Sequence, residues 1–415
     1  MKWQNKGHEF DELGNKFKEI KKIVFIGDDF NQTHYYIDKS IKDFLNFLDV
    51  KIEFVKLPKI FLKHRDLMKF AVSFINLKEK KAIIVPHYHY SEMTLVYKLC
   101  EYLKSKYPEK LIFSTNEFFE KYLSIFSVYS KDKTYVRDTC IIVTTVCTLN
   151  CKYCLNFTPF LQNPAPISLE KLKEEADVYF KSVDKVGFFQ ISGGEPLSYK
   201  QLGKYIEWLA QTYSSKIGQI LLATNGTLIP DEKLTKILKK YNVILLLDNY
   251  TKAVPRTQIT RDKLIKHLEN NHIDFRNYEK EQEFFKFFPA AEDYSKWSDE
   301  ELAERAEKCW GLQPWHNLRK GKVFYCCFSS LAVTAGIIQD NPANYYDLNS
   351  AVDKKELAEF LLGFSELGYD TFCKLCNGIS AANTLERDIA GFQAKKKYLW
   401  HEGMTLAEYE EITRD

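Results

Sequence analysis

Three cysteines follow a short apolar segment in the first half of the chain. The segment covers residues 141–146, and Cys147, Cys151 and Cys154 come directly after it with the spacing C-x3-C-x2-C. Closely spaced cysteines at the end of an expected strand indicate a metal site. A [4Fe–4S] cube takes four cysteines, so three would leave one iron open to a small chelating molecule. Zinc is the alternative, although structural zinc sites favour C-x2-C pairs and four protein ligands.

A second group of cysteines lies in the last third of the chain. Cys309 and Cys326 are followed by Cys373 and Cys376, which form a C-x2-C pair. Four thiolates drawn from distant segments suit either zinc or an iron–sulfur cluster. Cys327 is adjacent to Cys326, and neighbouring residues on a strand face opposite sides. We therefore expect one of these two to be a ligand.

Length and composition limit the classes of protein that are possible. A chain of 415 residues predicts two or three domains. Its 59 Lys and Arg residues against 56 Asp and Glu residues are interspersed, which favours neither nucleic acid nor an anionic membrane surface as a partner. The polar start at residues 1–16 and the lack of a long apolar run predict a cytoplasmic protein. Ten cysteines in a cytoplasmic protein indicate metal binding or catalysis rather than disulfides.

The first 132 residues alternate between strand and helix patterns. We expect a small α/β domain with a parallel sheet covered on both faces, because helices of this length separate the strands. The expected strands are residues 22–26, 51–55, 82–85 and 111–114. No G-x-G-x-x-G is present, so a dinucleotide ligand is not indicated.

After the three cysteines, each expected strand ends in polar or glycine residues. Residues 187–191 lead into Ser192, Gly193, Gly194, Glu195 and Pro196. Residues 219–223 lead into Thr224, Asn225, Gly226 and Thr227, and residues 243–247 lead into Asp248 and Asn249. Helix patterns separate these strands, and ligand-binding residues at the carboxyl ends of successive strands are typical of a parallel barrel.

The cysteine motif, G-G-E-P and T-N-G-T, in this order, resemble the signature of the radical SAM superfamily. The resemblance implies a partial (β/α)6 barrel over residues 133–297, with residues 283–288 as its sixth strand. It also implies that Cys147, Cys151 and Cys154 hold a [4Fe–4S] cluster whose open iron chelates S-adenosylmethionine (SAM). The residues that it implies for binding SAM are Tyr153, Ser192, Gly193, Gly194, Glu195, Thr224, Asn225 and Asp248.

The second cysteine group is similar to the SPASM and Twitch extensions of that superfamily. Cys309 is followed by eleven residues, Gly321, four residues and Cys326, which matches the opening motif and favours Cys326 over Cys327. A bulge would exchange the two. The resemblance implies an auxiliary [4Fe–4S] cluster on Cys309, Cys326, Cys373 and Cys376, within residues 298–383. No cysteine follows Cys376, so the segment resembles a Twitch extension more than a full SPASM extension. We expect residues 384–415 to form a helical tail.

The resemblance implies a radical SAM oxidoreductase. SAM would be cleaved to a 5'-deoxyadenosyl radical, which takes hydrogen from a substrate carbon, and the auxiliary cluster would accept an electron. Residues 156–160 are similar to radical SAM proteins associated with polysaccharide synthesis, so we expect a sugar-like or nucleotide-linked substrate and a flavodoxin or ferredoxin as electron donor. The alternatives are a maturase of ribosomal peptides and a non-catalytic zinc-binding interaction protein. No catalytic acid or base is assigned.

Overall fold

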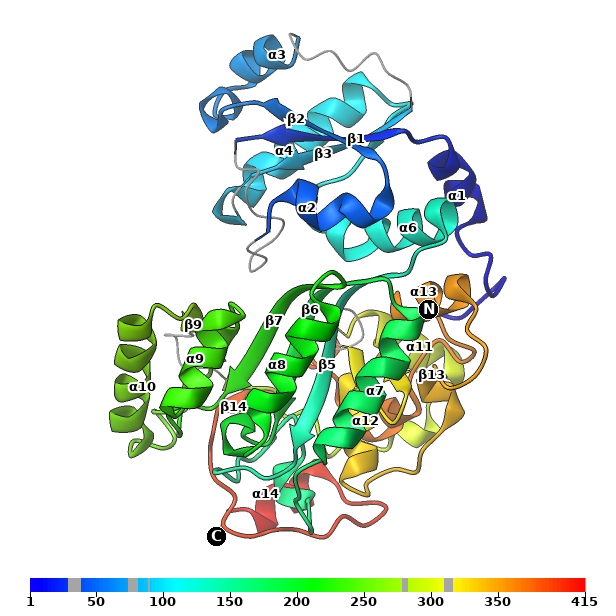
Figure 1. The fold of residues 1–415 in the computed structure, drawn as a ribbon. Helices are drawn as coiled ribbons and strands as arrows, with labels where there is room; N and C mark the ends of the chain where they lie inside the picture. The colour runs from blue at the N-terminus through cyan, green and yellow to red at the C-terminus, as the bar shows by residue number, and fades with distance from the viewer. Residues whose placement is uncertain (29–38, 74–80, 89, 278–282, 310–315, 415) are drawn as a thin grey trace. The chain divides into compact units, whose positions relative to one another are not determined.

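The fold is described from a computed structural model (Figure 1). It describes the chain except for residues 29–38, 74–80, 89, 278–282, 310–315 and 415. The described residues form two compact units. The N-terminal unit contains residues 8–137 and 183–187, and the C-terminal unit contains residues 1–7, 138–182 and 188–415.

The N-terminal unit is built on the expected parallel sheet. Its strand order is β2-β1-β3-β4, and each neighbouring pair is parallel. The strands are β1 (Lys22–Gly27), β2 (Lys51–Lys56), β3 (Ala82–His87) and β4 (Leu111–Ile112). All six residues of β3 are buried, which is the continuous apolar pattern of a strand in the middle of a parallel sheet.

Helices precede, connect and follow these strands. They are α1 (Asp11–Lys18), α2 (Ile41–Leu45), α3 (Arg65–Ser73), α4 (Met93–Lys106), α5 (Thr115–Glu117) and α6 (Leu123–Lys131). The fourth strand is shorter than expected because Ser114 begins a helix instead. Its side chain accepts a hydrogen bond from the Glu117 main chain, and the Glu117 carboxylate accepts one from the Ser114 main chain. This capping box ends the extended segment.

The C-terminal unit contains the largest sheet, in which β5, β6, β7, β8 and β9 are successive neighbours. Their bounds are Tyr135–Thr144, Lys185–Gly193, Ile217–Thr224, Ile244–Leu247 and Phe275–Asn277. The helices between them are α7 (Leu169–Ser182), α8 (Leu202–Tyr213), α9 (Glu232–Lys240) and α10 (Thr257–Asn271). Figure 1 shows α7 and α8 along one face of β5, β6 and β7. The predicted mixed α/β fold with parallel sheets is confirmed.

The prediction of a sixth parallel strand at residues 283–288 is wrong. Only β10 (Glu283–Phe284) is extended, and it pairs antiparallel with β14 (Asp388–Ile389), outside the large sheet. Phe287 and Phe288 are both buried, and each packs its ring against Phe157. Two adjacent side chains buried together do not fit the alternation of a strand.

The large sheet continues instead on the other side of β5. There β11 (His316–Arg319) pairs parallel with β5, followed by the antiparallel strands β12 (Lys322–Phe324) and β13 (Tyr345–Asp347). Lys320 and Gly321 form the hairpin turn between β11 and β12, and both residues adopt positive φ. That conformation is typical of tight hairpin turns.

The remaining helices are α11 (Asp299–Glu307), α12 (Cys327–Thr334), α13 (Lys354–Leu361) and α14 (Leu406–Ile412). The predicted helical tail is wrong for most of its length, since β14 and irregular chain precede α14. Among the described residues, no helix combines the length and apolar character needed to span a membrane.

Candidate functional site

A cavity of about 400 Å³ in the C-terminal unit brings the three cysteines together with most of the predicted SAM-binding residues. We call it the cluster cavity, and the segment from Cys147 to Cys154 the cluster loop. The predicted residues that line it are Cys147, Cys151, Cys154, Ser192, Gly193, Gly194, Thr224, Asn225 and Asp248. They come from the cluster loop and from the carboxyl ends of β6, β7 and β8, which is where a parallel barrel presents its ligands.

The cysteines of the cluster loop lie in apolar surroundings. Cys151 is buried with Leu149 and Val254, and Cys147 and Cys154 pack against this group. Burial, followed by the charge of Cys154, raises the pKa of Cys147 to about 12, and the same two causes raise the pKa of Cys151 well above its ordinary value. A metal that binds these sulfur atoms would therefore displace protons and supply the missing positive charge.

Polar hydrogens lie at the sulfur atoms. Asn225 Nδ2 is 3.6 Å from Cys147 Sγ, and Gln393 Nε2 donates to Cys151 Sγ at 3.2 Å. The Thr158 hydroxyl lies 3.2 Å from Cys154 Sγ. Hydrogen bonds to sulfur are one of the means by which proteins tune iron–sulfur clusters, so this donor set fits a [4Fe–4S] cluster.

Within the described ranges, no three Cys, His, Asp or Glu side chains converge as ligands of one metal ion. A cubane cluster does not need such convergence, because each cysteine binds a different iron.

Gly193 and Gly194 are required by the close approach of β6 to the cluster loop. A Cβ atom on Gly193 would lie 2.5 Å from the Thr144 carbonyl oxygen, and one on Gly194 would lie 2.3 Å from the Val146 carbonyl oxygen. The same contacts bring Gly194 N within 2.8 Å of the Thr144 oxygen as a hydrogen-bond donor. Glycine permits this main-chain contact, which fixes the start of the cluster loop.

Glu195 is fully buried and joins two motifs without lining the cluster cavity. Its carboxylate accepts hydrogen bonds from Thr224 Oγ1 at 2.9 Å, Asn225 N at 2.8 Å and Leu197 N at 2.9 Å. Burial raises the pKa of Glu195 to about 7, and these three donors oppose the shift. Glu195 thereby holds the turn after β7 against the end of β6.

Tyr153 is not brought to the cluster cavity. Its hydroxyl donates to Glu410 Oε1 at 2.9 Å, and its ring packs edge-on against Tyr409 in α14. Glu410 also forms an ion pair with Lys286 at 2.6 Å. The side chain of Tyr153 therefore attaches the cluster loop to the last helix.

The C-terminal tail lies along the cluster loop, which the sequence analysis missed. Ala394 N donates to the Asn150 carbonyl oxygen at 2.7 Å, and Asn150 N donates to Gln393 Oε1 at 2.8 Å. Lys397 Nζ donates to Asn150 Oδ1 at 3.1 Å. Gln393 thus binds both the main chain of the loop and the sulfur of Cys151. Nothing in the sequence distinguishes these residues from ordinary polar surface residues.

The second cysteine group also gathers in the C-terminal unit. Burial and the charges of Asp370, Cys327, Cys373 and Cys309 raise the pKa of Cys326 well above its ordinary value. Burial and the charge of Cys309 likewise raise the pKa of Cys376 to about 12. Cys309 therefore lies near thiols from two other segments.

Arg305 and Gly378 complete the surroundings of this group. Arg305 Nη1 donates to the Cys373 carbonyl oxygen at 3.2 Å, and Nη2 of the same side chain donates to the Cys376 carbonyl oxygen. Gly378 N donates to Cys376 Sγ at 3.2 Å. A positive charge and an N–H donor at cysteines suit bound thiolates.

Cys326 and Cys327 face different surroundings. Both lie in the field of Cys309, but only Cys326 is also in the field of Cys373, whereas Cys327 lines the cluster cavity together with Cys140. The two residues are the N-cap and first residue of α12 rather than neighbours on a strand. The two side chains thus differ in their surroundings because they lie at the start of a helix, and not because they alternate along a strand as expected.

A family model matches the part of the chain that contains this site. The model of the radical SAM superfamily matches residues 141–251, so the chain contains a radical SAM domain. The matched segment includes the three cysteines of the cluster loop and the residues at the ends of β6, β7 and β8.

Two curated relatives share sequence with the chain. It is 34% identical over 109 residues to the GTP 3',8-cyclase of Helicobacter pylori (strain HPAG1), covering 26% of this chain and 31% of that protein. It is 33% identical over 108 residues to the GTP 3',8-cyclase of Helicobacter pylori (strain ATCC 700392 / 26695), covering 25% and 30%. The chain thus spans about a third of the length of the curated relatives that it matches.

Two solved structures are also similar. BtrN in complex with AdoMet and 2-DOIA is 14% identical with a TM-score of 0.34, over 61% of this chain and 97% of that one. Native anSMEcpe with bound AdoMet is 14% identical with a TM-score of 0.34, over 66% of this chain and 96% of that one. At these TM-scores, neither likeness defines the fold or the substrate of this chain.

The network around Glu195 predicts a loss of stability in Glu195→Gln. Three donors face the two carboxylate oxygens, so the amide of glutamine would turn its NH2 group towards at least one donor. We expect the free energy of unfolding, measured in urea at pH 8, to fall by ~1–3 kcal/mol. The matched control is Glu232→Gln at an exposed position on α9, which should show no comparable loss. Equal stability of Glu195→Gln and the wild type would contradict the assigned role.

The tail contact predicts that Gln393→Ala alters a cluster bound to the loop. The variant loses the N–H donor to Cys151 Sγ and the acceptor for Asn150 N. We expect less iron per chain after anaerobic reconstitution and a more negative reduction potential of the remaining cluster, measured by redox titration with electron paramagnetic resonance. Gln258→Ala, at an exposed position on α10, is the control. Identical iron content and potential in both variants would refute a role of the tail.

Proposed function

We propose that this protein is a radical SAM enzyme in which Cys147, Cys151 and Cys154 hold a [4Fe–4S] cluster. The observation that carries the proposal is the cluster cavity. There the three cysteines meet two glycines and the proline of G-G-E-P, the first two residues of T-N-G-T, and Asp248. When bound and reduced, such a cluster would supply the one electron that reductive cleavage of SAM to methionine requires, and the adenosyl part of SAM would then take a hydrogen atom from a substrate carbon.

The cavity residues position SAM beside the cluster loop. Asn225 is fixed in orientation, because its Oδ1 accepts from Thr227 N at 3.1 Å and its Nδ2 donates to Thr148 Oγ1 at 3.1 Å. Asp248 accepts from the Tyr250 hydroxyl at 2.9 Å, so its carboxylate is also held in place. A fixed carboxylate and the main-chain groups of Gly193 and Gly194 suit the hydroxyl and amino groups of SAM.

Part of the cavity wall is apolar. Leu149 and Cys151 of the cluster loop are buried with Val254, and Phe284 packs against them. A radical formed on a bound cofactor reacts with whatever lies next to it, so exclusion of other reactants is part of the function.

The second cysteine group supports an auxiliary [4Fe–4S] cluster on Cys309, Cys326, Cys373 and Cys376. Their mutual proximity and the donors from Arg305 and Gly378 support this ligand set. Four cysteine ligands leave no open iron, so such a cluster would transfer electrons rather than chelate a substrate. Removal of a hydrogen atom and then an electron from the substrate amounts to a two-electron oxidation of the substrate. A flavodoxin or ferredoxin would be the electron donor to the first cluster.

The proposed substrate is a sugar-like or nucleotide-linked small molecule. The two relatives named GTP 3',8-cyclase are compatible with a nucleotide, although they match about a third of their length. The sequence after the third cysteine, at residues 156–160, favours a sugar.

Replacement of Cys147, Cys151 and Cys154 together by alanine tests the central assignment. We expect 5'-deoxyadenosine formation from SAM under dithionite to be abolished, because no thiolate remains to hold the first cluster. Iron bound by the second cysteine group should persist. Cys100→Ala, a buried cysteine of the N-terminal unit, should retain full SAM cleavage. Cleavage that survives in the triple variant would refute the assignment.

Separate alanine variants of Cys326 and Cys327 test the auxiliary site. Cys326→Ala should lose about four of about eight irons per chain after reconstitution, whereas Cys327→Ala should retain them. Both residues are buried, so each is a packing control for the other. Iron loss confined to Cys327→Ala would reverse the ligand assignment. Wild-type iron content in both variants would remove Cys326 from the ligand set.

A further inference from the structure

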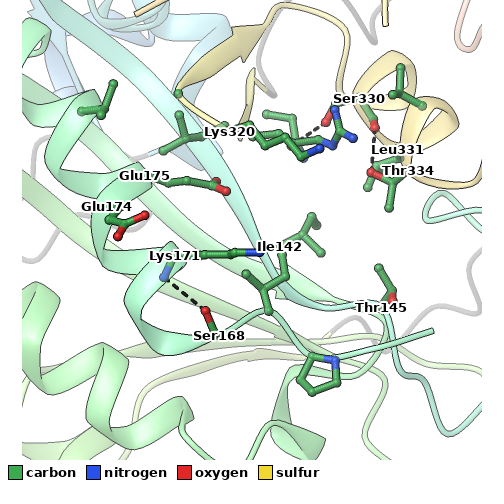
Figure 2. A pocket seen from close by; sticks show the side chains of 18 of the residues that line it. Ile142, Thr145, Ser168, Lys171, Glu174, Glu175, Lys320, Ser330, Leu331 and Thr334 are labelled. Carbon is green, nitrogen blue, oxygen red and sulfur yellow. Dashed lines mark hydrogen bonds between the residues drawn. The ribbon is translucent and has the colours of Figure 1, made fainter. Parts of the chain in front are cut away.

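A second cavity, of about 840 Å³, lies between α7, the β11–β12 hairpin and α12 (Figure 2). It lies beside the carboxyl end of β5, where pairing with β11 stops at Ile141 and Leu318. Ile142, Asn317 and Leu331 line both this second cavity and the cluster cavity. The two cavities are therefore adjacent and share one wall.

Asn317 presents an unsatisfied donor at this shared wall. Its side chain is 1% exposed, and its Oδ1 accepts from Ser330 Oγ at 3.0 Å. Its Nδ2 is buried and has no hydrogen-bond partner among the described residues. A buried amide of this kind is unfavourable unless a ligand or an ordered water supplies an acceptor, because nearly all buried polar groups are paired in folded proteins.

Arg319 provides a second donor on the same strand. Residues 317 and 319 share one face of β11, because side chains alternate along a strand. Arg319 Nη1 is buried and unpaired within the described part of the chain. Both Arg319 and Asn317 line the second cavity, so two unsatisfied N–H groups border the same space.

The charged groups around the second cavity favour an anion. The lining cations are Lys171, Arg319 and Lys320, and the lining carboxylates are Glu174 and Glu175. Figure 2 shows Lys171 and Glu175 extending from α7 into the cavity, with Lys320 across from them. Burial raises the pKa of Glu175, and a hydrogen bond from the Lys320 main chain and the charges of Arg319 and Lys320 oppose this shift.

Asp340 also lies in the field of Arg319, but it already pairs with Lys322 at 2.7 Å. Arg319 Nη1 thus remains without a hydrogen-bond acceptor among the described residues. The lining of the cavity contains three cations and two carboxylates.

We propose that the second cavity binds the anionic group of the substrate, a phosphate or a carboxylate, through Asn317 and Arg319. The shared wall of Ile142, Asn317 and Leu331 keeps this anionic group next to the cluster cavity. The volume lies within the range of small-molecule sites. Guanidinium and amide N–H groups are suited to either oxyanion. This inference rests on the proposed function for the identity of the ligand as a substrate.

Isothermal titration calorimetry of the anaerobically reconstituted protein tests the site. The probes are inorganic pyrophosphate for phosphate, malonate for carboxylate, and glucose as an uncharged control. We expect pyrophosphate or malonate to bind and glucose not to bind. The anion that binds more tightly identifies the chemical source of the charge.

Variants separate this site from other cationic surfaces. Arg319→Gln and Asn317→Asp should each weaken anion binding at least tenfold, the first by removing a charge and the second by introducing a carboxylate of equal size. Arg65→Gln, at the exposed start of α3, should bind as the wild type does. Thermal unfolding of each variant shows that it is folded. The proposal is overturned if neither anion binds the wild type, or if folded Arg319→Gln and Asn317→Asp both retain wild-type affinity.

The calorimetry is carried out without reductant, so it does not depend on SAM cleavage. Anion binding that is lost in the two cavity variants, in a protein that never cleaves SAM, would support the site and refute the enzyme proposal. SAM cleavage without anion binding would refute the site alone.

Discussion

The cluster loop depends on main-chain contact between its first residues and the end of β6. Gly193 and Gly194 allow the two segments to approach so closely that any Cβ atom would overlap a carbonyl oxygen of Thr144 or Val146. Hydrogen bonds from Gly194 N and Glu195 N to those oxygens, each 2.8 Å long, then set the direction in which the loop leaves β5. The position of the cysteine sulfurs, and so of anything bound to them, follows from this contact.

Two further elements hold the loop from other sides. The buried Glu195 carboxylate joins the turn after β7 to the end of β6, and this brings Asn225 to Cys147. The C-terminal tail contributes Gln393 to Cys151 and connects Tyr153 to Glu410. Segments far apart in sequence therefore determine the surroundings of each sulfur, which is how a protein adjusts the affinity and potential of a cluster at a fixed set of ligands.

The sequence alone predicted most strands of the two larger sheets, and the cysteines and strand ends that line the cluster cavity, because local signals carry them. It also predicted Tyr153 and Glu195 there, and these two lie outside the lining. Buried apolar runs identify β1 and β3, and a glycine turn after β6 marks the ligand side. The sixth strand failed because residues 283–288 are apolar enough for a strand, yet Phe287 and Phe288 bury their rings against Phe157. The tail contacts and the joining of β11 to β5 could not be predicted, since they depend on pairing between distant segments that no local pattern records.

The central proposal is that the cluster loop holds iron and sulfide and that the protein cleaves SAM. The most direct test is to measure iron and acid-labile sulfide in the wild-type protein after anaerobic reconstitution, together with 5'-deoxyadenosine formation from SAM under dithionite. We expect about eight irons per chain, a matching amount of sulfide and formation of 5'-deoxyadenosine. A colourless protein that contains zinc in place of iron and leaves SAM intact would contradict it.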